Sequence, residues 1–420
     1  MRDIINEIGN TIRHNKLRTA LTGFSVAWGI FILIVLLGAG NGLINAMLSN
    51  NKRFLSNSMM VFGGNTSKAF DGLNEGRNIE LNDRDMLITE TLFADNITSM
   101  GAEIEREGCV LTLNDNYTTG INISGVYPND VQINKRVMLT GRFVNDKDLK
   151  DKRKCIVINT DMAKELLPHS PMSVCGKDIS MDNLSFRVVG IYESEKNKMG
   201  NTAFIPFTTF RGIYGSGDKA GNIIFSFENI NSEQANEEFA KSLRAALNTN
   251  HRAAPDDENS VWIWNRFLHN LNMNTATGMI SKALWVIGLL TLLSGIVGIS
   301  NIMLITVKER TKEFGIRKAI GAKPWSILRL IIVESVVITT FFGYIGMVLG
   351  IGANLYMDAT IGHTEVDNGL FQAQMFLDPT VGIGVCVQAT ILMIVAGTIA
   401  GLIPARKAAK IRPIEALRAE

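Results

Sequence analysis

Metal-binding and nucleotide-binding motifs are missing from this sequence of 420 residues. Its four cysteines form no CxxC pair and its five histidines form no HExxH pair, so a metalloprotease has no support. No GxxxxGKS or GxxxxGKT segment is present, so the chain has no P-loop for ATP phosphates. The glycine-rich segment 215–221 has a different spacing and is predicted to be a surface turn. We therefore expect no catalytic residue, no metal site and no cofactor in this chain.

Cysteines are also too few to form a disulfide framework. Cys109, Cys155 and Cys175 fall in the long region after the first apolar window, and Cys386 falls in the last one. A disulfide between Cys155 and Cys175 is compatible with an oxidising compartment. Free buried thiols are the favoured expectation.

Charge is almost absent from four long windows, 19–51, 283–307, 330–357 and 379–403. Each exceeds the roughly 20 apolar residues that cross a bilayer as a helix, and the first is too long for a cleaved signal peptide. Glu334 is the only Asp, Glu, Lys, Arg or His within these windows, which disfavours an ion-coupled transporter. We expect Glu334 at the membrane interface, either snorkelling or paired with Arg329. The predicted fold is membrane α-helical, with spans at 19–43, 283–307, 330–353 and 379–403.

Apart from the long region 44–282, Lys and Arg occur only in three short segments, 1–18, 308–329 and 404–420. The segment 354–378, between the third and fourth spans, contains acidic residues but neither Lys nor Arg. Because cytoplasmic loops are enriched in Lys and Arg, we predict a cell (inner) membrane protein with both termini cytoplasmic and residues 44–282 outside. Isoleucines at helical spacing in 1–18 predict an amphipathic surface helix, with a simple charged anchor as the alternative.

The outer region, 44–282, is long enough for a domain with its own core. Alternating and β-branched stretches predict strands, namely SMMVFGG, TTGINISGVYP, KCIVINT, FRVVGIYES, TAFIPFTTF and SVWIWN. Helices are predicted at 81–93, with Asn82 or Asp83 as N-cap, and at 160–167 and 232–248. The pattern indicates an α+β domain. Its flanks, 44–57 and 267–282, are predicted to extend the membrane helices as a stalk.

The segment KERTKEFGIRKAIGAKPWSIL, 308–328, is densely charged and lies between the second and third spans. Residues 308–320 are predicted to form one amphipathic helix, with Gly321 as its C′ residue and Pro324 as the first residue of the next helix. A helix fixed to the ends of two spans suits a docking surface, in which its Phe and Ile side chains fill a partner's groove. A basic patch that binds lipid headgroups is the alternative.

This segment resembles the signature R-x-x-E-x-G-I-R-(K/R)-A-(I/L)-G-A of the FtsX-like family of ABC transporter permeases. The C-terminal GLIPARKAAKIRPIEALRAE and the N-terminal NKLRTALTGFSVAWGI are similar to the two ends of that family. GRFVNDKD, VCGKDI and FRVVGIYES are similar to MacB-type extracytoplasmic domains. The resemblance thus covers essentially the whole chain. The residues that it marks for coupling to an ATPase are Arg310, Glu313, Phe314, Gly315, Ile316, Arg317, Lys318, Ala319, Gly321 and Ala322.

The resemblance implies a permease that works with separate cytoplasmic ABC ATPase subunits, which would bind ATP and Mg. This differs from MacB exporters, in which the ATPase is fused ahead of the permease. It also implies that 308–320 is the coupling helix and that two permease copies form a homodimer or heterodimer. GxxxG spacings at Gly346 with Gly350, and at Gly397 with Gly401, allow close helix packing. With so few polar groups in the spans, we expect mechanotransmission to the outer domain instead of a water-filled channel.

Three roles within the family are open. MacB-like tripartite efflux of drugs, peptides or toxins, with a periplasmic adaptor and an outer-membrane channel, is favoured by the size and motifs of the outer region. Lipoprotein release, as by LolC/LolE-type permeases, and regulation of cell-wall hydrolases, as by FtsX, are the alternatives. Outside the transporters, the alternative is a membrane protein for signalling or adhesion that binds a ligand. Membrane lipids are expected contacts, and nucleic acid is not.

Overall fold

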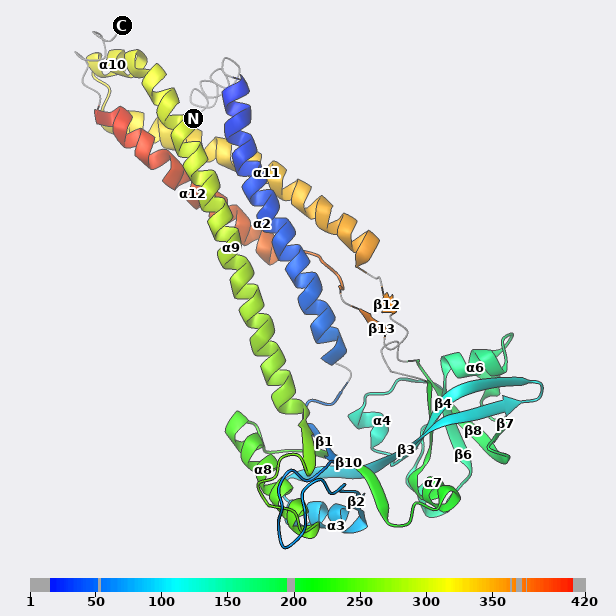
Figure 1. Ribbon diagram of the computed structural model, residues 1–420. Coiled ribbons are helices and arrows are strands. Elements are labelled where there is room, and N and C mark those ends of the chain that lie inside the picture. The colour runs from blue at the N-terminus through cyan, green and yellow to red at the C-terminus, as the bar shows by residue number, and fades with distance from the viewer. Residues whose placement is uncertain are drawn as a thin grey trace. The chain divides into compact units, whose positions relative to one another are not determined.

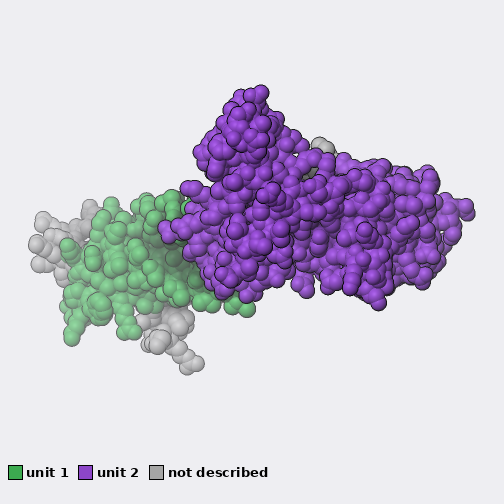
Figure 2. Space-filling view, turned by 90° about the horizontal axis from the view of Figure 1, so that it is seen from below, with its two compact units in different colours: residues 1–47, 275–365, 374–420 green, residues 48–274, 366–373 purple. Residues whose placement is uncertain are grey.

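The computed structural model describes residues 16–51, 54–194, 201–362, 365–367, 372–374 and 376–410. The predicted surface helix up to residue 15 and the end of the C-terminal motif from residue 411 lie outside the described residues. The chain divides into two compact units (Figure 2). Unit 1 contains Met1–Met47, Thr275–Glu365 and Gln374–Glu420, and unit 2 contains Leu48–Asn274 and Val366–Ala373.

Long apolar helices dominate unit 1 (Figure 1). Within the described residues, four helices are long and apolar enough to cross a membrane. They are α2 (Lys16–Asn51), α9 (Arg266–Glu309), α11 (Pro324–Ile361) and α12 (Ile383–Lys410). The larger part of unit 2 lies between α2 and α9 in the sequence, and the short part Val366–Ala373 lies between α11 and α12. This confirms the predicted fold class of four membrane helices with a large domain of helices and strands, predicted as α+β, between the first and the second.

These helices extend beyond the windows without charge. α9 starts at Arg266 and so covers 267–282, where we predicted a helical stalk. α12 continues through Pro404 to Lys410, which makes the start of the predicted tail 404–420 helical. The segment between α11 and α12 contains a two-stranded sheet, β12 (Glu365–Asp367) and β13 (Gln372–Gln374).

The glycines of the first GxxxG pair lie where α11 meets α2. A Cβ atom on Gly346 would lie 2.2 Å from the carbonyl oxygen of Ala27, and one on Gly350 would lie 2.8 Å from the side chain of Ile34. Nearby, the buried Asn354 amide donates to the Ile34 carbonyl oxygen at 2.9 Å. Since water cannot satisfy these groups inside a membrane, the hydrogen bond supports the close approach that the glycines permit.

The second pair lies where α12 meets α11. A Cβ atom on Gly397 would lie 3.0 Å from the Thr339 side chain, and one on Gly401 would lie 2.9 Å from that of Ser335. The Ser335 hydroxyl donates to the Gly397 carbonyl oxygen at 2.9 Å. Both glycine pairs are therefore used for packing between helices of this chain.

Unit 2 is built on an 11-stranded mixed sheet in the order β11-β1-β10-β3-β4-β9-β6-β8-β5, with β2 on β10, and β7 on β3 and β8. The pairs β4–β9 and β6–β8 are parallel. The strands are β1 (Ser58–Gly63), β2 (Leu81–Asn82), β3 (Ile97–Leu113), β4 (Asn116–Val126), β5 (Met138–Gly141), β6 (Cys155–Asn159), β7 (Asp178–Met181), β8 (Leu184–Tyr192), β9 (Asn201–Pro206), β10 (Lys219–Phe227) and β11 (Val261–Asn265). The helices are α3 (Asp83–Leu92), α4 (Asp130–Ile133), α5 (Asp146–Lys150), α6 (Thr160–Leu166), η1 (Pro171–Val174), α7 (Phe207–Tyr214) and α8 (Glu233–Asn250).

The two largest apolar clusters of unit 2 support this sheet. In the first, Phe239, Leu243 and Leu247 of α8 pack on residues of β1 and β10. In the second, Met162 and Leu166 of α6 pack with residues of β3, β4, β6 and β8. Unit 2 therefore has enough buried apolar surface to hold its own shape.

The predicted helices of unit 2 are confirmed, including the N-cap of α3. The Asn82 side chain accepts from the backbone amides of Arg84 and Asp85, and the Asp85 side chain accepts from the Asn82 amide, which forms a capping box. One strand prediction is wrong at its end, since TAFIPFTTF stays extended only to Pro206 and then forms α7. Phe207 is fully buried there, because a helical turn places it in the core beside β1 and β10.

The long strand β3 and its partner β10 are absent from our sequence predictions, because their charged and glycine-containing segments show no clear alternation. The turn predicted at 215–221 is present over 215–218, with Gly215 and Gly217 at positive φ, whereas residues 219–221 already belong to β10. Cys109, Cys155 and Cys175 are free, so the disulfide that we considered does not form.

Candidate functional site

The segment 308–320, between the second and third spans, is divided between two helices. α9 ends at Glu309, Arg310 adopts φ −89° and ψ 12°, and α10 runs Thr311–Ala319. Our prediction of a single helix over 308–320 is therefore wrong at its start. The Thr311 hydroxyl donates to the Val307 and Lys308 carbonyl oxygens at the end of α9. These bonds satisfy carbonyls that the break in the helix leaves open.

The end of α10 follows the local sequence chemistry. Gly321 has φ 96°, which a glycine adopts without strain. Its amide donates to the Lys318 carbonyl oxygen at 3.0 Å, and the Ala322 amide donates to that of Arg317 at 2.9 Å, which is the Schellman pattern. Pro324 then lies at the start of α11, as predicted.

A network of charges holds α10 against α11. The Arg310 guanidinium donates to both Glu313 carboxylate oxygens, at 2.7 and 2.9 Å, and to Glu334 of α11 at 3.3 Å. Arg317 donates to Glu313 at 2.7 Å. The hydrogen bond from Arg310 is the main reason that the pKa of Glu313 is held below its usual range, although burial opposes it.

Glu334 is the residue whose partner sequence reasoning missed. It is 5% exposed and pairs with Arg310, whereas we expected an interfacial carboxylate that snorkels or pairs with Arg329. A buried carboxylate requires a compensating charge because desolvation is costly. The sequence signal for a buried ion pair was that Glu334 is the single charge of the third span and follows a segment rich in Lys and Arg.

Phe314 turns inward. It is 1% exposed and belongs to the apolar core that α2, α9, α11 and α12 form, and the Arg310 guanidinium lies 5.1 Å from its ring centroid. Gly315 is buried beside it. Phe314 therefore anchors α10 and is not available to fill a partner's groove, which corrects that part of our prediction.

The outward face of α10 is apolar. Ile316 is 50% exposed, Ile320 81% and, on the first turn of α11, Trp325 70%. Ala319 is exposed, and Ala322 is half-buried. The Lys318 ammonium donates to the Ala409 carbonyl oxygen at 2.5 Å, near the end of α12. The residues marked for coupling thus divide into an anchored inner set and an exposed apolar face, which we call the α10 face (Ile316, Ala319, Ile320 and Trp325).

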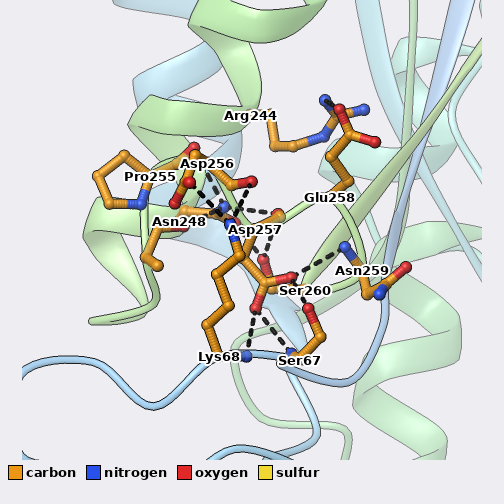
Figure 3. Close-up of polar contacts among 11 residues, drawn as sticks. Ser67, Lys68, Arg244, Asn248, Pro255, Asp256, Asp257, Glu258, Asn259 and Ser260 are labelled. Atoms are coloured by element: carbon orange, nitrogen blue, oxygen red, sulfur yellow. Dashed lines mark hydrogen bonds and ion pairs between the residues drawn. The ribbon is translucent and has the colours of Figure 1, made fainter.

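In unit 2, a buried aspartate fixes the loop between β1 and β2 (Figure 3). Asp257 is 0% exposed and accepts from the Ser67 hydroxyl and amide, both at 2.7 Å, and from the amides of Asn259 at 3.1 Å and Lys68 at 3.2 Å. Burial acts to raise the pKa of Asp257, but these hydrogen bonds outweigh it and lower the pKa. Lys68 also pairs with Asp256 at 2.7 Å. The loop is therefore part of the rigid surface of unit 2.

Four helices long and apolar enough to cross a membrane, a short helix between two of them and an inserted α/β unit are the architecture of a multi-span membrane protein. Residues 19–244 match the MacB-like periplasmic core domain, and residues 285–413 match the FtsX-like permease C-terminal domain. The chain belongs to the FtsX-like, MacB-type family of ABC transporter permeases. The coupling residues, the absence of metal and the absence of a catalytic residue stay predictions.

Relatives of this chain include the Macrolide export ATP-binding/permease protein MacB of Bdellovibrio bacteriovorus, 27% identical over 98% of this chain and 60% of that protein. The uncharacterized ABC transporter permease YknZ of Bacillus subtilis is 29% identical over 72% of this chain and 71% of its own length. The crystal structure of the periplasmic region of MacB from Actinobacillus actinomycetemcomitans, at 17% identity, matches 54% of this chain and 97% of that chain with a TM-score of 0.43. The chain spans about 60% of the length of the MacB relatives.

Proposed function

We propose that this permease transmits ATP-driven motion from a cytoplasmic ABC ATPase in a separate polypeptide to unit 2, which lies outside the cell (inner) membrane. The observation that carries the proposal is the α10 face. Ile320, at 81% exposure, and Trp325, at 70%, present apolar surface beside exposed lysines. The opposite side of α10 packs against the membrane helices through Phe314. An exposed apolar patch with a charged rim is typical of a protein interaction site.

The rigid attachment of α10 supports a mechanical role. Arg310 and Glu334 join α10 to α11, Lys318 joins it to the end of α12, and Phe314 fixes it to the core. A force applied to the α10 face would therefore move these helices together instead of bending a loose loop. This is what a coupling helix needs, because packed elements shift as bodies.

The continuity of α9 supports transmission toward unit 2. Its 44 residues, at about 1.5 Å each, give a helix of about 66 Å. The helix begins one residue after β11 and ends two residues before α10. One unbroken helix therefore runs from the last strand of the sheet, β11, to α10. This continuity favours mechanotransmission.

The names of the MacB relatives support export as the direction of transport. We propose efflux of a drug-like, peptide or toxin molecule that reaches unit 2 from the outside or from the outer leaflet, with two permease copies and a periplasmic adaptor leading to an outer-membrane channel. Both termini and α10 would then be cytoplasmic, as the positions of Lys and Arg favour. ATP and Mg would bind to the partner ATPase.

The test is purification of the full chain from native membranes in mild detergent, with mass spectrometry of bound proteins. A P-loop ABC ATPase is expected with the wild type and should be lost from Ile320→Asp, which places a charge in the α10 face. Leu92→Asp is the matched control, because Leu92 is 64% exposed on unit 2. Equal recovery of the ATPase with all three proteins would overturn the assignment of the α10 face. Recovery of phospholipid alone would favour the lipid-binding alternative.

A further inference from the structure

Arg266, the first residue of α9, is a buried cation inside unit 2. Its exposure is 3%. One terminal nitrogen, Nη1, donates to the Ser58 hydroxyl at 3.3 Å and to the Ile133 carbonyl oxygen at 3.4 Å. The other, Nη2, donates to Oδ1 of Asn134 at 3.0 Å. The guanidinium is therefore held in a fixed direction by groups from β1 and from the end of α4.

Two aromatic rings flank the same guanidinium. Its central carbon lies 4.3 Å from the ring centroid of Phe54 and 4.9 Å from that of Trp264. Phe54 belongs to the short segment that follows α2, and Trp264 belongs to β11, directly before α9. Cation–π contacts strengthen when the cation is desolvated. Arg266 thus contacts the segment that follows α2 and the strand that precedes α9.

The contacts of Arg266 continue into a buried polar network. The Asn134 amide donates to Asp130 at 2.5 Å, and Asp130 pairs with Arg136 at 2.6 Å, with side-chain exposures of 2% and 1%. The Leu55 amide donates to the Ile133 carbonyl oxygen at 2.8 Å. Arg266 Nε is buried without a hydrogen-bond partner, so its two terminal nitrogens carry the contacts to this network. Buried polar networks rigidify the elements that they join.

We propose that Arg266 is the joint that fixes the outer end of α9 to the sheet of unit 2, and that it is a positioning residue for transmission. This inference rests on the proposed function. A long helix moves a domain only if its end cannot slide or rotate in the contact. Apolar packing alone would hold α9 but would not fix its direction, whereas the fork-shaped guanidinium donates along defined lines. Because the rings of Phe54 and Trp264 both contact the Arg266 guanidinium, this one side chain holds the segment after α2 and the strand before α9 together.

The rigidity of the joint can be measured directly within unit 2. Spin labels on Asn272→Cys, exposed on α9, and Glu237→Cys, exposed on α8, would report their distance in the full chain in nanodiscs. The four native cysteines are replaced by alanine for this purpose. The wild-type joint is expected to give one narrow distance distribution. Arg266→Met, which keeps an apolar stem against the rings but has no donors, is expected to broaden it.

Two further variants separate the joint from general stability. Arg77→Met is the matched control, since Arg77 donates to the His251 and Arg252 carbonyl oxygens elsewhere in unit 2 and should leave the distribution narrow. Arg266→Lys keeps the charge without the fork and should broaden the distribution less than Arg266→Met does. It also provides the answer if Arg266→Met fails to fold. A narrow distribution in every folded Arg266 variant would overturn the proposal.

The same samples distinguish failure of the joint from failure of the proposed function. With the ATPase bound, ATP is expected to change hydrogen–deuterium exchange in unit 2 of the wild type. This response should be lost in Arg266→Met while ATP hydrolysis continues. If ATP changes nothing in the wild type but Arg266→Met still broadens the distance, the joint stands and transmission is refuted. If exchange in unit 2 of Arg266→Met responds to ATP as in the wild type, Arg266 does not position α9 for transmission.

Discussion

Replacement of Arg310 by methionine is expected to destabilise unit 1, because it removes the cation that faces the Glu334 carboxylate. The side chains of Arg310 and Glu334 are 16% and 6% exposed. Breaking a buried ion pair by removal of one partner costs about 3–5 kcal/mol. The 3.3 Å separation between nitrogen and oxygen is long for a charged hydrogen bond, so we expect a loss in the free energy of unfolding of about 3 kcal/mol.

Removal of both charges should be much less harmful. Replacing a buried pair by apolar residues of similar volume is often neutral, so Arg310→Met combined with Glu334→Leu is expected to return to within about 1 kcal/mol of the wild type. Glu313→Gln is the control within the same network. The Glu313 side chain is 38% exposed, so its loss should cost only about 0–1 kcal/mol.

The assay is equilibrium unfolding of the full chain in mixed detergent micelles, followed by tryptophan fluorescence. A double-mutant cycle on Arg310 and Glu334 gives their interaction free energy, which we expect to exceed about 1.5 kcal/mol. An interaction below about 0.5 kcal/mol would refute the view that this pair fixes α10 to α11. So would a double variant as unstable as the sum of the two single variants.

Three other perturbations probe unit 2 and the helix packing. Asp257→Asn should destabilise unit 2 by about 1–3 kcal/mol at pH 7. The pKa of Asp257 is lowered in the folded state, so the ionised carboxylate stabilises unit 2 above the unfolded pKa of about 3.9. This stabilisation is lost as the pH falls through the folded pKa. The difference in melting temperature between this variant and the wild type should therefore be smaller at pH 3 than at pH 7. Asp256→Asn, at an exposed site, should match the wild type at both pH values. Gly346→Ala should cost about 1–3 kcal/mol in micelle unfolding, because its Cβ would meet a backbone carbonyl at 2.2 Å; Gly352→Ala, which meets nothing within 4 Å, should cost nothing, and equal effects would contradict the packing. Burial raises the pKa of Cys155 to about 12, so the native thiol should resist maleimide at pH 8 and react only after unfolding, and fast native labelling would contradict its burial.

The membrane helices and the turn after α10 could be predicted because the signals are local. A run without charge of more than 20 residues has few stable arrangements other than a membrane helix. Gly321 and Pro324 mark the end of one helix and the start of the next through backbone geometry alone. Asn82 identifies the start of α3 for the same reason, since a capping box involves only neighbouring residues.

The directions of individual side chains on α10 could not be predicted. Phe314 and Ile320 are both apolar and lie on one short helix, yet one is 1% exposed and the other 81%. Six residues at about 100° each place the two side chains on different faces of α10. The packing of α10 against the membrane helices decides which of these faces turns inward, and sequence periodicity across 308–320 does not reveal that choice because the break at Arg310 changes the direction of the helix.

Contacts between distant segments were likewise decided by tertiary structure. Glu334 pairs with Arg310, 24 positions earlier, instead of with the nearby Arg329. Arg266 meets Ser58 and Asn134, more than 130 positions away. The sequence alone determined which segments are apolar enough to enter a membrane and where the backbone must turn, because those properties belong to short stretches of chain. Which buried charge compensates which other charge depends on how whole helices and strands pack, and only the folded chain brings those groups within a few ångströms of one another.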